Sequence, residues 1–261
     1  EVIANTTGFD AFIDGHSHST FSETIKDKSG KEVVFEQTGT KLANVGKIII
    51  KADGTITHEN VDLNTVEPDA EAAAYIQTIT DKFDALQKQV VAKTSVELTI
   101  NGADGKRAVR NAETNLGDLC ADAYRILLGA DIAFVNGGGV RDNIKVGDIT
   151  YGDIIKVHPF GNEACLVEVT GQQIKDALEL GSAAYPGESG GFLQVSGLTY
   201  TINADIPSSV VKNDKSEFVK VDGAYRVSDI MVGGQPLDVN KTYTLASHNY
   251  MLKDAGDGYT M

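Results

Sequence analysis

The sequence predicts an α/β (α+β) protein with a mixed sheet, and two observations support this fold class. From about Val91, strand-like and helix-like stretches alternate in the order strand, helix, strand, loop, strand, helix, strand. This order is typical of an α/β or α+β domain. The first 66 residues instead consist of short strand-like runs and turns, with few helical periods. We therefore expect three parts: 1–66, a helical linker at 67–90, and a domain at 91–261.

The first part contains two strand-like runs. They are "DAFIDG" at 10–15 and "KIIIKADGTITHENVDL" at 47–63. The Asp53-Gly54 pair inside the second run predicts a β-hairpin turn. Too few apolar residues are present to form a core, so we expect this part to be the last third of a larger domain.

A long helix is predicted over "EPDAEAAAYIQTITDKFDALQKQVV" at 67–91. Pro68 suits the first turn of a helix. About 23 helical residues span roughly 34 Å, enough to join two domains. One apolar stripe recurs at spacings of three and four residues: Ile76, Ile79, Phe83, Leu86 and Val90.

The third part has strands at 94–100, 131–136 and 164–169, separated by helices at 115–130 and 170–181. Asn115 and Asp118 resemble a capping pair at the first helix, and Thr170 with Gln173 form a capping box at the second. Gly181 is the expected stop of the second helix. One apolar face of the first helix is expected to be formed by Leu116, Leu119, Cys120, Ala123 and Leu127.

Composition excludes several classes of function. The 261 residues carry a net charge of −14 and have a pI near 4.7, which argues against nucleic acid polymers and anionic membranes as partners. A small anionic ligand remains possible where basic residues cluster. No stretch approaches the ~18 apolar residues of a membrane span. Cys120 and Cys165 make no disulfide framework, and we expect both to be buried free thiols.

The stretch "FIDGHSHSTF" places His16 and His18 directly after a strand-like run. Residues i and i+2 of an extended strand point to the same face, so both imidazoles could approach one metal ion or a pair of ions. Asp14 and the nearby hydroxyl groups are candidates for fixing the imidazole tautomers. A closed structural zinc site is not expected, because no further His or Cys follows at the required spacing. The alternative is a polar turn with two solvated histidines.

A glycine-rich loop, "VNGGGVR", follows the buried strand at 131–136. Gly138 and Gly139 allow a ligand to approach the backbone closely. Arg141 at its end, and Arg110 in "GKRAVR", are suitable partners for a phosphate or carboxylate. The loop is neither a P-loop nor a G-x-G-x-x-G motif, so an ordinary tight turn and two surface arginines are the alternative.

Two aromatic residues and one acid complete the pattern. Phe160 lies in "VHPFGN", and Tyr250 precedes "GDGY", in which Asp257 stands between two glycines. Aromatic faces can enclose a flat heterocycle, and a carboxylate can accept two hydrogen bonds from a ribose diol. Core packing and an Asp-Gly turn are the plain alternatives. Taken together, these groups suit a nucleotide whose phosphate meets metal ions.

The chain resembles the bacterial and animal 5'-nucleotidases, a family that includes UDP-sugar hydrolases and cyclic-phosphodiesterase relatives. "IDGHSHS" is similar to the last metal motif of their N-terminal metallophosphoesterase domain. Six further motifs are similar to landmarks of their C-terminal substrate-binding domain. The resemblance therefore implies the tail of a metal domain followed by a mixed-sheet nucleotide-binding domain. The motifs, in order, are "ETNLGDLCADAY", "NGGGVRDNI", "GDITYGDI", "HPFGN", "GFLQVSGLTY" and "AGDGY".

The resemblance also implies roles for single residues. His16 and His18 would contact a two-metal centre of zinc, manganese or similar divalent ions. Asp257 would hold the ribose hydroxyls. In the family, six positions separate the second stacking aromatic from this acid. Here seven separate Tyr250 from Asp257, so either the loop has an extra residue or Met251 takes part in stacking. The remaining substrate-binding residues would be Arg110, Asn136, Gly138, Gly139, Arg141, Phe160 and Asn162.

The expected activity is hydrolysis of a nucleoside 5'-monophosphate by metal-activated water, with this chain supplying mainly nucleotide binding. No catalytic residue is assigned here, because the family's earlier metal motifs are absent and lie before Glu1 or are lost. The chain by itself is therefore expected to be inactive. Alternatives are a 2',3'-cyclic-nucleotide phosphodiesterase, a UDP-sugar hydrolase or a non-catalytic nucleotide-binding module. The expected partner is a small nucleotide or nucleoside, and the expected location is secreted, periplasmic or at the cell surface.

Overall fold

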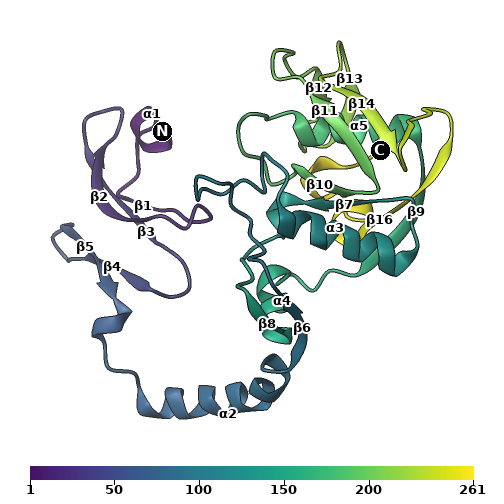
Figure 1. Ribbon diagram of the computed structural model, residues 1–261. Coiled ribbons are helices and arrows are strands. Elements are labelled where there is room, and N and C mark those ends of the chain that lie inside the picture. Colours follow the sequence, from purple (N-terminus) through teal and green to yellow (C-terminus); the bar gives the residue numbers. More distant parts are fainter. The chain divides into compact units, whose positions relative to one another are not determined.

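The computed structural model describes residues 1–261 and divides into two compact units, Glu1–Asp81 and Lys82–Met261. The boundary between the two units along the chain falls within helix α2 (Ala70–Gln87), drawn in blue in Figure 1. No helix combines the length and the apolar character that crossing a membrane requires.

The first unit is built on a three-stranded sheet with the order β1-β3-β2. Strand β1 runs parallel to β3, and β2 pairs with β3 in antiparallel register. Strands β4 and β5 form a hairpin whose turn holds Gly54 at a φ of 85°, as the Asp53-Gly54 pair predicted. The elements are α1 (Val2–Asn5), β1 (Ala11–Ile13), β2 (Thr20–Lys26), β3 (Glu32–Thr38), β4 (Asn44–Ile50), β5 (Ile56–Asp62) and the 3₁₀ turn η1 (Leu63–Thr65).

The core of this unit is small, as its composition predicted. Val33 and Val34 are buried in β3, and the next residue, Phe35, contacts the rings of Phe12 and Phe21. Buried polar side chains occupy the same strand, among them Glu36 and Gln37, each 1% exposed. The unit therefore relies on polar contacts between its strands as much as on apolar packing.

Helix α2 begins two residues after Pro68, and Asp69 caps it by accepting a hydrogen bond from the backbone N–H of Ala72 at 2.8 Å. Its apolar stripe is exposed, with Ile76 at 59% and Phe83 at 54%. The helix ends at Gln87, earlier than predicted. Because the chain turns to pair in a sheet, strand β6 occupies Val90–Thr94, and the strand predicted at 94–100 is absent.

A four-stranded mixed sheet with the order β10-β7-β16-β9 forms the centre of the second unit. Strands β7 and β16 are parallel, and the two outer pairings are antiparallel. Every residue of β7 is buried, as its continuous apolar run predicted. The strands are β7 (Ile132–Asn136), β9 (Ala164–Thr170), β10 (Leu193–Ser196) and β16 (Thr242–His248).

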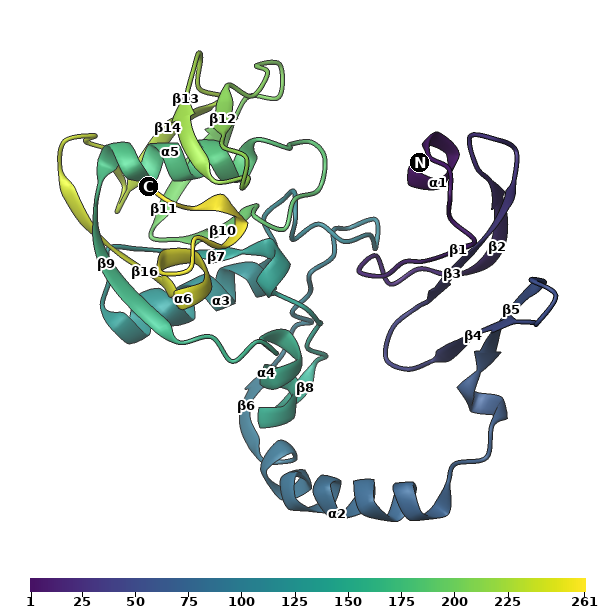
Figure 2. The same ribbon diagram turned by 180° about the vertical axis from the view of Figure 1, so that it is seen from behind.

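Helices α3 (Asn115–Leu128) and α5 (Gly171–Ser182) cover opposite faces of this sheet, as Figures 1 and 2 show. Alternation along β7 explains the two layers. Phe134 packs in the cluster under α5, whereas Val135 packs in the cluster under α3. The C-terminal end of β7, which carries Asn136, therefore lies between the two apolar clusters.

The N-terminal cap of α5 was predicted correctly, and that of α3 was not. Thr170 and Gln173 form the expected capping box of α5, although the helix continues one residue past Gly181. Helix α3 is capped by Thr114, and not by Asn115. The side chain of Asn115 instead accepts from the N–H of Thr99 at 2.8 Å. The apolar face of α3 is only partly covered, because Leu119 is 43% and Leu127 77% exposed.

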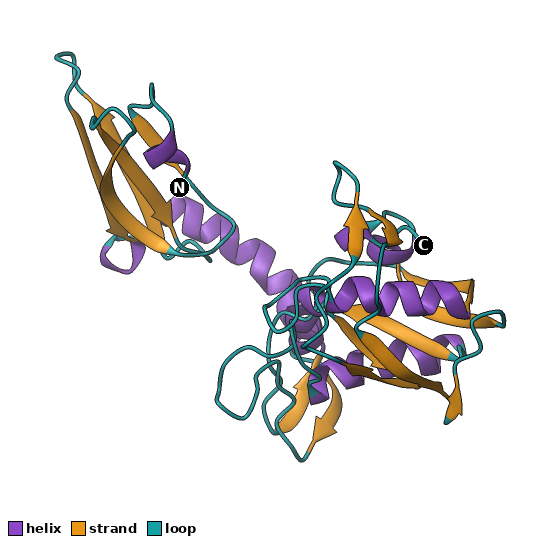
Figure 3. Cartoon of the chain, turned by 90° about the horizontal axis from the view of Figure 1, so that it is seen from above, coloured by secondary structure: helices purple, strands orange, loops and turns teal.

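The remaining elements surround the central sheet (Figure 3). They form the antiparallel sheet β11-β14-β15 and the pairs β12–β13 and β6–β8. Both cysteines are free thiols, but only Cys120 is buried, since Cys165 lies half-buried on β9. The bounds are β8 (Gly147–Thr150), α4 (Tyr151–Val157), β11 (Leu198–Ile202), β12 (Val210–Lys212), β13 (Phe218–Val221), β14 (Val227–Val232), β15 (Gln235–Pro236), α6 (Asn249–Leu252) and the 3₁₀ turns η2 (Gly137–Gly139) and η3 (Gly256–Gly258).

Candidate functional site

Strand β7 ends at Asn136, whose side chain is bonded to the acid predicted to hold a ribose. Its Nδ2 donates a hydrogen bond to Asp257 Oδ2 at 2.7 Å, and the residue is only 4% exposed. The other amide atom, Oδ1, is buried and has no hydrogen-bond partner. Buried polar atoms are nearly always paired, so this oxygen marks a position where a donor is expected.

The glycines after β7 allow close backbone packing. A Cβ atom on Gly139 would lie 2.7 Å from Asn136 Oδ1, and one on Gly138 would lie 3.0 Å from the Cα of Gly190. The N–H of Gly138 donates to the carbonyl of Gly190 at 2.7 Å. The loop is therefore fixed by its neighbours, and side chains are excluded there.

Asp257 lies in the turn η3 with a φ of 54°, a left-handed conformation that is uncommon for a residue with a side chain. Its Oδ1 accepts a hydrogen bond from the hydroxyl of Tyr250 at 3.2 Å. Gly256 permits this approach, because a Cβ there would lie 2.4 Å from the Tyr250 ring. The backbone strain and the missing Cβ together bring the acid and the aromatic ring into contact.

Tyr250 is 39% exposed, whereas Met251 beside it is 1% exposed in the core of the unit. Met251 therefore cannot take part in stacking, and that interpretation of the seven-residue spacing is wrong. Partial burial raises the pKa of the Tyr250 hydroxyl, and the negative charge of Asp257 raises it further. The hydroxyl thus remains a donor to the carboxylate.

Arg110 is half-buried beside two other guanidinium groups. Burial lowers the pKa of Arg110, and the positive charges of Arg107 and Arg141 lower it further. The carboxylates of Glu188 and Asp257 act in the opposite direction. An arginine keeps its charge under such shifts, so the three cations form a region suited to an anionic ligand.

Arg107 was missed by the analysis of the sequence. Its guanidinium holds Glu188 in a two-point ion pair, with Nε to Oε1 at 2.9 Å and Nη2 to Oε2 at 2.5 Å. Both side chains are more than one third exposed. The only signal in the sequence was its place in "KRAVR", three residues before Arg110.

Arg141 connects the glycine loop with the first aromatic ring. Its Nη1 donates to the carbonyl of Gly138 at 3.3 Å, and its Cζ lies 5.8 Å from the centre of the Phe160 ring. This cation–π contact leaves Phe160 60% exposed. Asn162, two residues further, is half-buried.

Most of the predicted ligand residues are thus joined in one series of contacts within the second unit. The series runs from an exposed ring through a cation, the glycine loop, an amide and a carboxylate to a second, partly exposed ring. Neither ring is buried in a core, so the plain alternative of core packing is wrong for both. That the two rings enclose a base stays a prediction, as does the role of Asn162. The series is Phe160, Arg141, Gly138, Gly139, Asn136, Asp257 and Tyr250.

His16 and His18 lie in the first unit and are not on an extended strand. Strand β1 ends at Ile13, and both histidines have left-handed backbones, with φ of 67° and 60°. The hydroxyl of Ser17, between them, bonds to the Gln37 side chain at 3.1 Å. The predicted strand geometry is therefore wrong, although both imidazoles are exposed. The tautomer-fixing role of the nearby hydroxyl groups stays a prediction.

His16 and His18 alone do not make a complete metal site. In residues 1–261 no three His, Cys, Asp or Glu side chains are grouped closely enough to hold a metal ion. The carboxylate of Asp14 accepts from the N–H of Gly15 at 2.8 Å. The donor atoms of this chain therefore do not fit a two-metal centre without further ligands.

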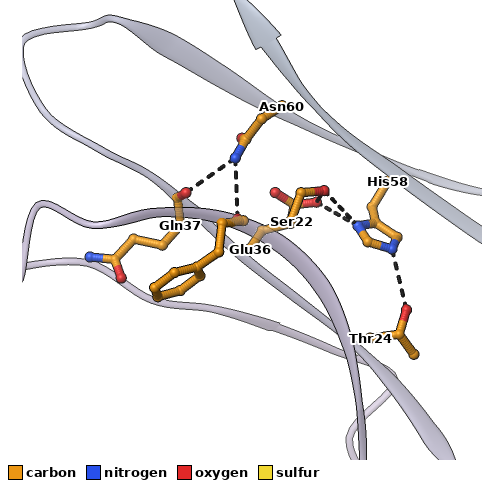
Figure 4. Close-up of polar contacts among 7 residues, drawn as sticks. Ser22, Thr24, Glu36, Gln37, His58 and Asn60 are labelled. Atoms are coloured by element: carbon orange, nitrogen blue, oxygen red, sulfur yellow. Dashed lines mark hydrogen bonds and ion pairs between the residues drawn. The ribbon is translucent and has the colours of Figure 1, made fainter.

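A second polar cluster in the first unit was also missed (Figure 4). The Nδ1 atom of His58 on β5 lies 2.6 Å from Glu36 Oε1 and 2.9 Å from Ser22 Oγ. From the same strand, Asn60 Nδ2 donates to the carbonyls of Phe21 and Gln37 at 3.1 and 3.2 Å. These bonds tie the β4–β5 hairpin to strands β2 and β3, and so to the segment that carries His16 and His18.

Comparison with protein families identifies the second unit. A model described as "5'-nucleotidase, C-terminal domain" matches residues 90–261, more than half of the chain. This chain belongs to the 5'-nucleotidase family. The mixed α/β architecture described above is consistent with that domain.

Two curated members of the 5'-nucleotidase family illustrate the similarity. The chain is 31% identical over 286 residues to the trifunctional nucleotide phosphoesterase protein YfkN of Bacillus subtilis, covering 100% of this chain and 18% of that protein. It is 37% identical over 156 residues to a 5'-nucleotidase of Vibrio cholerae, covering 59% of this chain and 24% of that protein. The chain thus spans a quarter or less of the length of these relatives.

A solved structure of the 5'-nucleotidase family extends the comparison to the whole chain. The 5'-nucleotidase precursor of Thermus thermophilus superposes with a TM-score of 0.74 and 28% identity, covering 99% of this chain and 53% of that one. Both units of this chain therefore have counterparts in that protein.

Proposed function

We propose that this chain is the nucleotide-binding part of a metal-dependent phosphohydrolase acting on nucleoside 5'-monophosphates. The observation that carries the proposal is the bond between Asn136 and Asp257 at 2.7 Å, since it links the glycine loop to the segment bearing Tyr250. The family assignment and the names of the relatives support the same activity.

In this proposal the base lies between the Phe160 and Tyr250 rings, with Asn162 at the base edge. Asp257 takes the ribose hydroxyls. Its Oδ1 is bonded to the Tyr250 hydroxyl at 3.2 Å, so a ribose would replace or share that bond. The buried, unpaired Oδ1 of Asn136 offers an acceptor to the same ligand.

The phosphate is expected beside Arg110 and Arg141, with Gly138 and Gly139 admitting it to the backbone. Arg110 is held near two other cations, which lower its pKa, and an anion would relieve this arrangement. Arg107 adds to the field, although Glu188 neutralises much of its charge. This charge pattern favours a nucleotide over a nucleoside.

We assign residues 1–66 to the tail of a metallophosphoesterase domain, 67–90 to a linker helix and 91–261 to the substrate-binding domain. His16 and His18 would contribute to a two-metal centre of zinc, manganese or a similar divalent ion, which activates water for attack on phosphorus when bound. Two donors cannot hold such a centre, so this chain alone is expected to be inactive. The Thermus relative is described as a precursor, which supports a secreted, periplasmic or surface location.

A broader phosphoester specificity is the second candidate. One relative that matches the full chain is named a trifunctional nucleotide phosphoesterase, which supports more than one nucleotide ester as substrate. The 2',3'-cyclic nucleotides that the family resemblance implies are alternative substrates. UDP-sugars and a role in binding without hydrolysis stay as further alternatives. All of them use the same nucleotide-binding residues, and the hydrolytic alternatives differ in the ester that meets the metals.

The test is calorimetric titration of the chain with AMP, adenosine, 2',3'-cyclic AMP and a UDP-sugar. We expect AMP to bind more tightly than adenosine. Hydrolysis of the same panel by the longer protein then identifies the ester. Absence of binding by all four ligands would refute the proposal.

A further inference from the structure

Arg226 is an arginine buried in the second unit, away from the residues of the candidate site series. It directly precedes β14 and is 4% exposed. Its guanidinium bonds to backbone carbonyls, with Nε to Ile206 at 3.1 Å and Nη1 to Ser182 and Tyr185 at 2.8 and 3.0 Å. Burying a guanidinium group is costly unless its N–H donors are paired. The backbone carbonyls provide that pairing, so the side chain and the carbonyls hold each other in place.

A buried carboxylate supports this arrangement from the adjoining helix. Glu179 on α5 is 0% exposed, and its Oε2 accepts from the backbone N–H of Arg226 at 2.9 Å and of Val227 at 3.1 Å. These bonds fix the backbone from which the guanidinium extends. Arg226 therefore reaches the end of α5 from a rigid base, not from a mobile surface loop.

The segment that Arg226 holds, Ser182–Gly191, continues directly to the arginine side of the site. The backbone N–H of Ser189 donates to the carbonyl of Arg110 at 2.9 Å. One residue earlier, Glu188 holds the Arg107 guanidinium in the two-point ion pair. Two of the three cations thus take their positions from this segment.

The same segment also contacts the glycine loop and the acid. The carbonyl of Gly190 accepts from the N–H of Gly138 at 2.7 Å, and a Cβ on Gly191 would lie 3.0 Å from the Cβ of Asp257. At its far end, the buried hydroxyl of Tyr259 donates to the carbonyl of Gly191 at 2.5 Å. The segment is therefore fixed at both ends and contacts both sides of the site between them.

We propose that Arg226 is a positioning residue for nucleotide binding. It acts through Ser182–Gly191, the segment that sets Arg110, Gly138 and Asp257 relative to one another. This inference rests on the proposed function, because it names what orders the same site. Arg226 itself contacts no part of the expected ligand.

The test compares Arg226→Met with Arg125→Met in the full chain. Arg125 on α3 also bonds through Nε, to Ser196 Oγ at 2.6 Å, but holds no part of the segment. We expect Arg226→Met to weaken AMP binding about tenfold, the change that 1.4 kcal/mol produces, and Arg125→Met to leave it unchanged. Low concentrations of guanidinium chloride should restore AMP binding to Arg226→Ala, whereas sodium chloride at equal ionic strength should not. Rescue by guanidinium and not by sodium would show that the loss comes from the missing guanidinium group.

A folded Arg226→Met protein that binds AMP as tightly as the wild type would overturn the inference. The amide NMR signals of Gly138 and Ser189, recorded without nucleotide, separate this result from failure of the proposed function. They should move in Arg226→Met even if the wild-type chain binds no nucleotide, and unmoved signals would refute the positioning role. If the Arg226 variants do not fold, Tyr259→Phe releases the other end of the segment. It should weaken AMP binding in the same direction, and unchanged binding would again count against the proposal.

Discussion

Asn136 and Asp257 stand 121 residues apart in the chain and are joined by a hydrogen bond of 2.7 Å from Nδ2 to Oδ2. The bond connects the end of the central strand β7 with the C-terminal turn η3. It thereby sets the glycine loop against the segment that carries Tyr250. The first prediction concerns this pair.

Asn136→Ala should destabilise the protein and weaken AMP binding together. Removing the amide leaves one oxygen of a partly buried carboxylate without its donor, at a cost of about 1–3 kcal/mol. Urea denaturation followed by circular dichroism measures the change in the free energy of unfolding. Asn60→Ala is the control, because it removes a hydrogen-bonding amide in the first unit, and equal loss of AMP affinity in both variants would contradict the assignment.

Phe160→Ala should weaken binding of both adenosine and AMP. Stacking on an aromatic ring contributes about 1–3 kcal/mol per base, which corresponds to a loss of roughly 5- to 150-fold. The ring is 60% exposed, so the free energy of unfolding should change little. Calorimetry gives the affinity, and Phe218→Ala on β13 provides a control aromatic outside the site. Unchanged affinity in Phe160→Ala would remove the stacking role.

Arg141→Ala should weaken AMP binding much more than adenosine binding. Its proposed partner is the phosphate, which only AMP carries. The guanidinium also lies 5.8 Å from the Phe160 ring, so a small loss for adenosine is expected as well. The ratio of the two affinities, measured by calorimetry, isolates the phosphate contact. Equal losses for both ligands would show that Arg141 only supports the ring.

Stability should fall in acid because of His248. Burial lowers the pKa of this imidazole to about 4, with a smaller contribution from the positive charge of His158. Between pH 6.5 and pH 4 the unfolded chain therefore binds more protons than the folded one, so stability is complete above this window and is lost as the pH falls through it. The loss is about 3 kcal/mol at most. Denaturation of the wild type and His248→Phe at several pH values checks this, because the free energy of unfolding of the wild type, relative to that of the variant, should fall between pH 6.5 and pH 4. A constant difference would contradict the prediction.

Elements set by neighbouring residues were predictable from the sequence. The buried strand β7, the Asp53-Gly54 hairpin and the Thr170–Gln173 capping box each have their sequence signal within a few consecutive residues. The prediction of a strand at 94–100 was wrong, because pairing with β8 selected Val90–Thr94 instead. Here tertiary pairing decided which residues form the strand, and it overrode the local alternating pattern.

The site was predictable in its residue types and not in its connections. Asn136, Asp257 and Tyr250 could be named from motifs, but their mutual bonds depend on a left-handed backbone at Asp257. The proposed positioning role of Arg226 could not be predicted from the sequence. In the sequence it is an ordinary arginine before a strand, and only the structure gives its buried carbonyl partners. Long-range contacts of this kind leave no periodic signal in the sequence.

The last prediction concerns metal binding by this chain. His16 and His18 are exposed and have left-handed backbones, and the chain groups no third ligand with them. Zinc and manganese sites need three or four fixed ligands to compete with water, so the chain should bind either ion no better than an isolated pair of histidines. Calorimetric titration with each ion measures this, with His16→Ala as the variant and His58→Ala as the control for a histidine elsewhere in the unit. Tight binding of one ion per chain that His16→Ala abolishes, and His58→Ala leaves intact, would show that the two histidines have further ligands within residues 1–261.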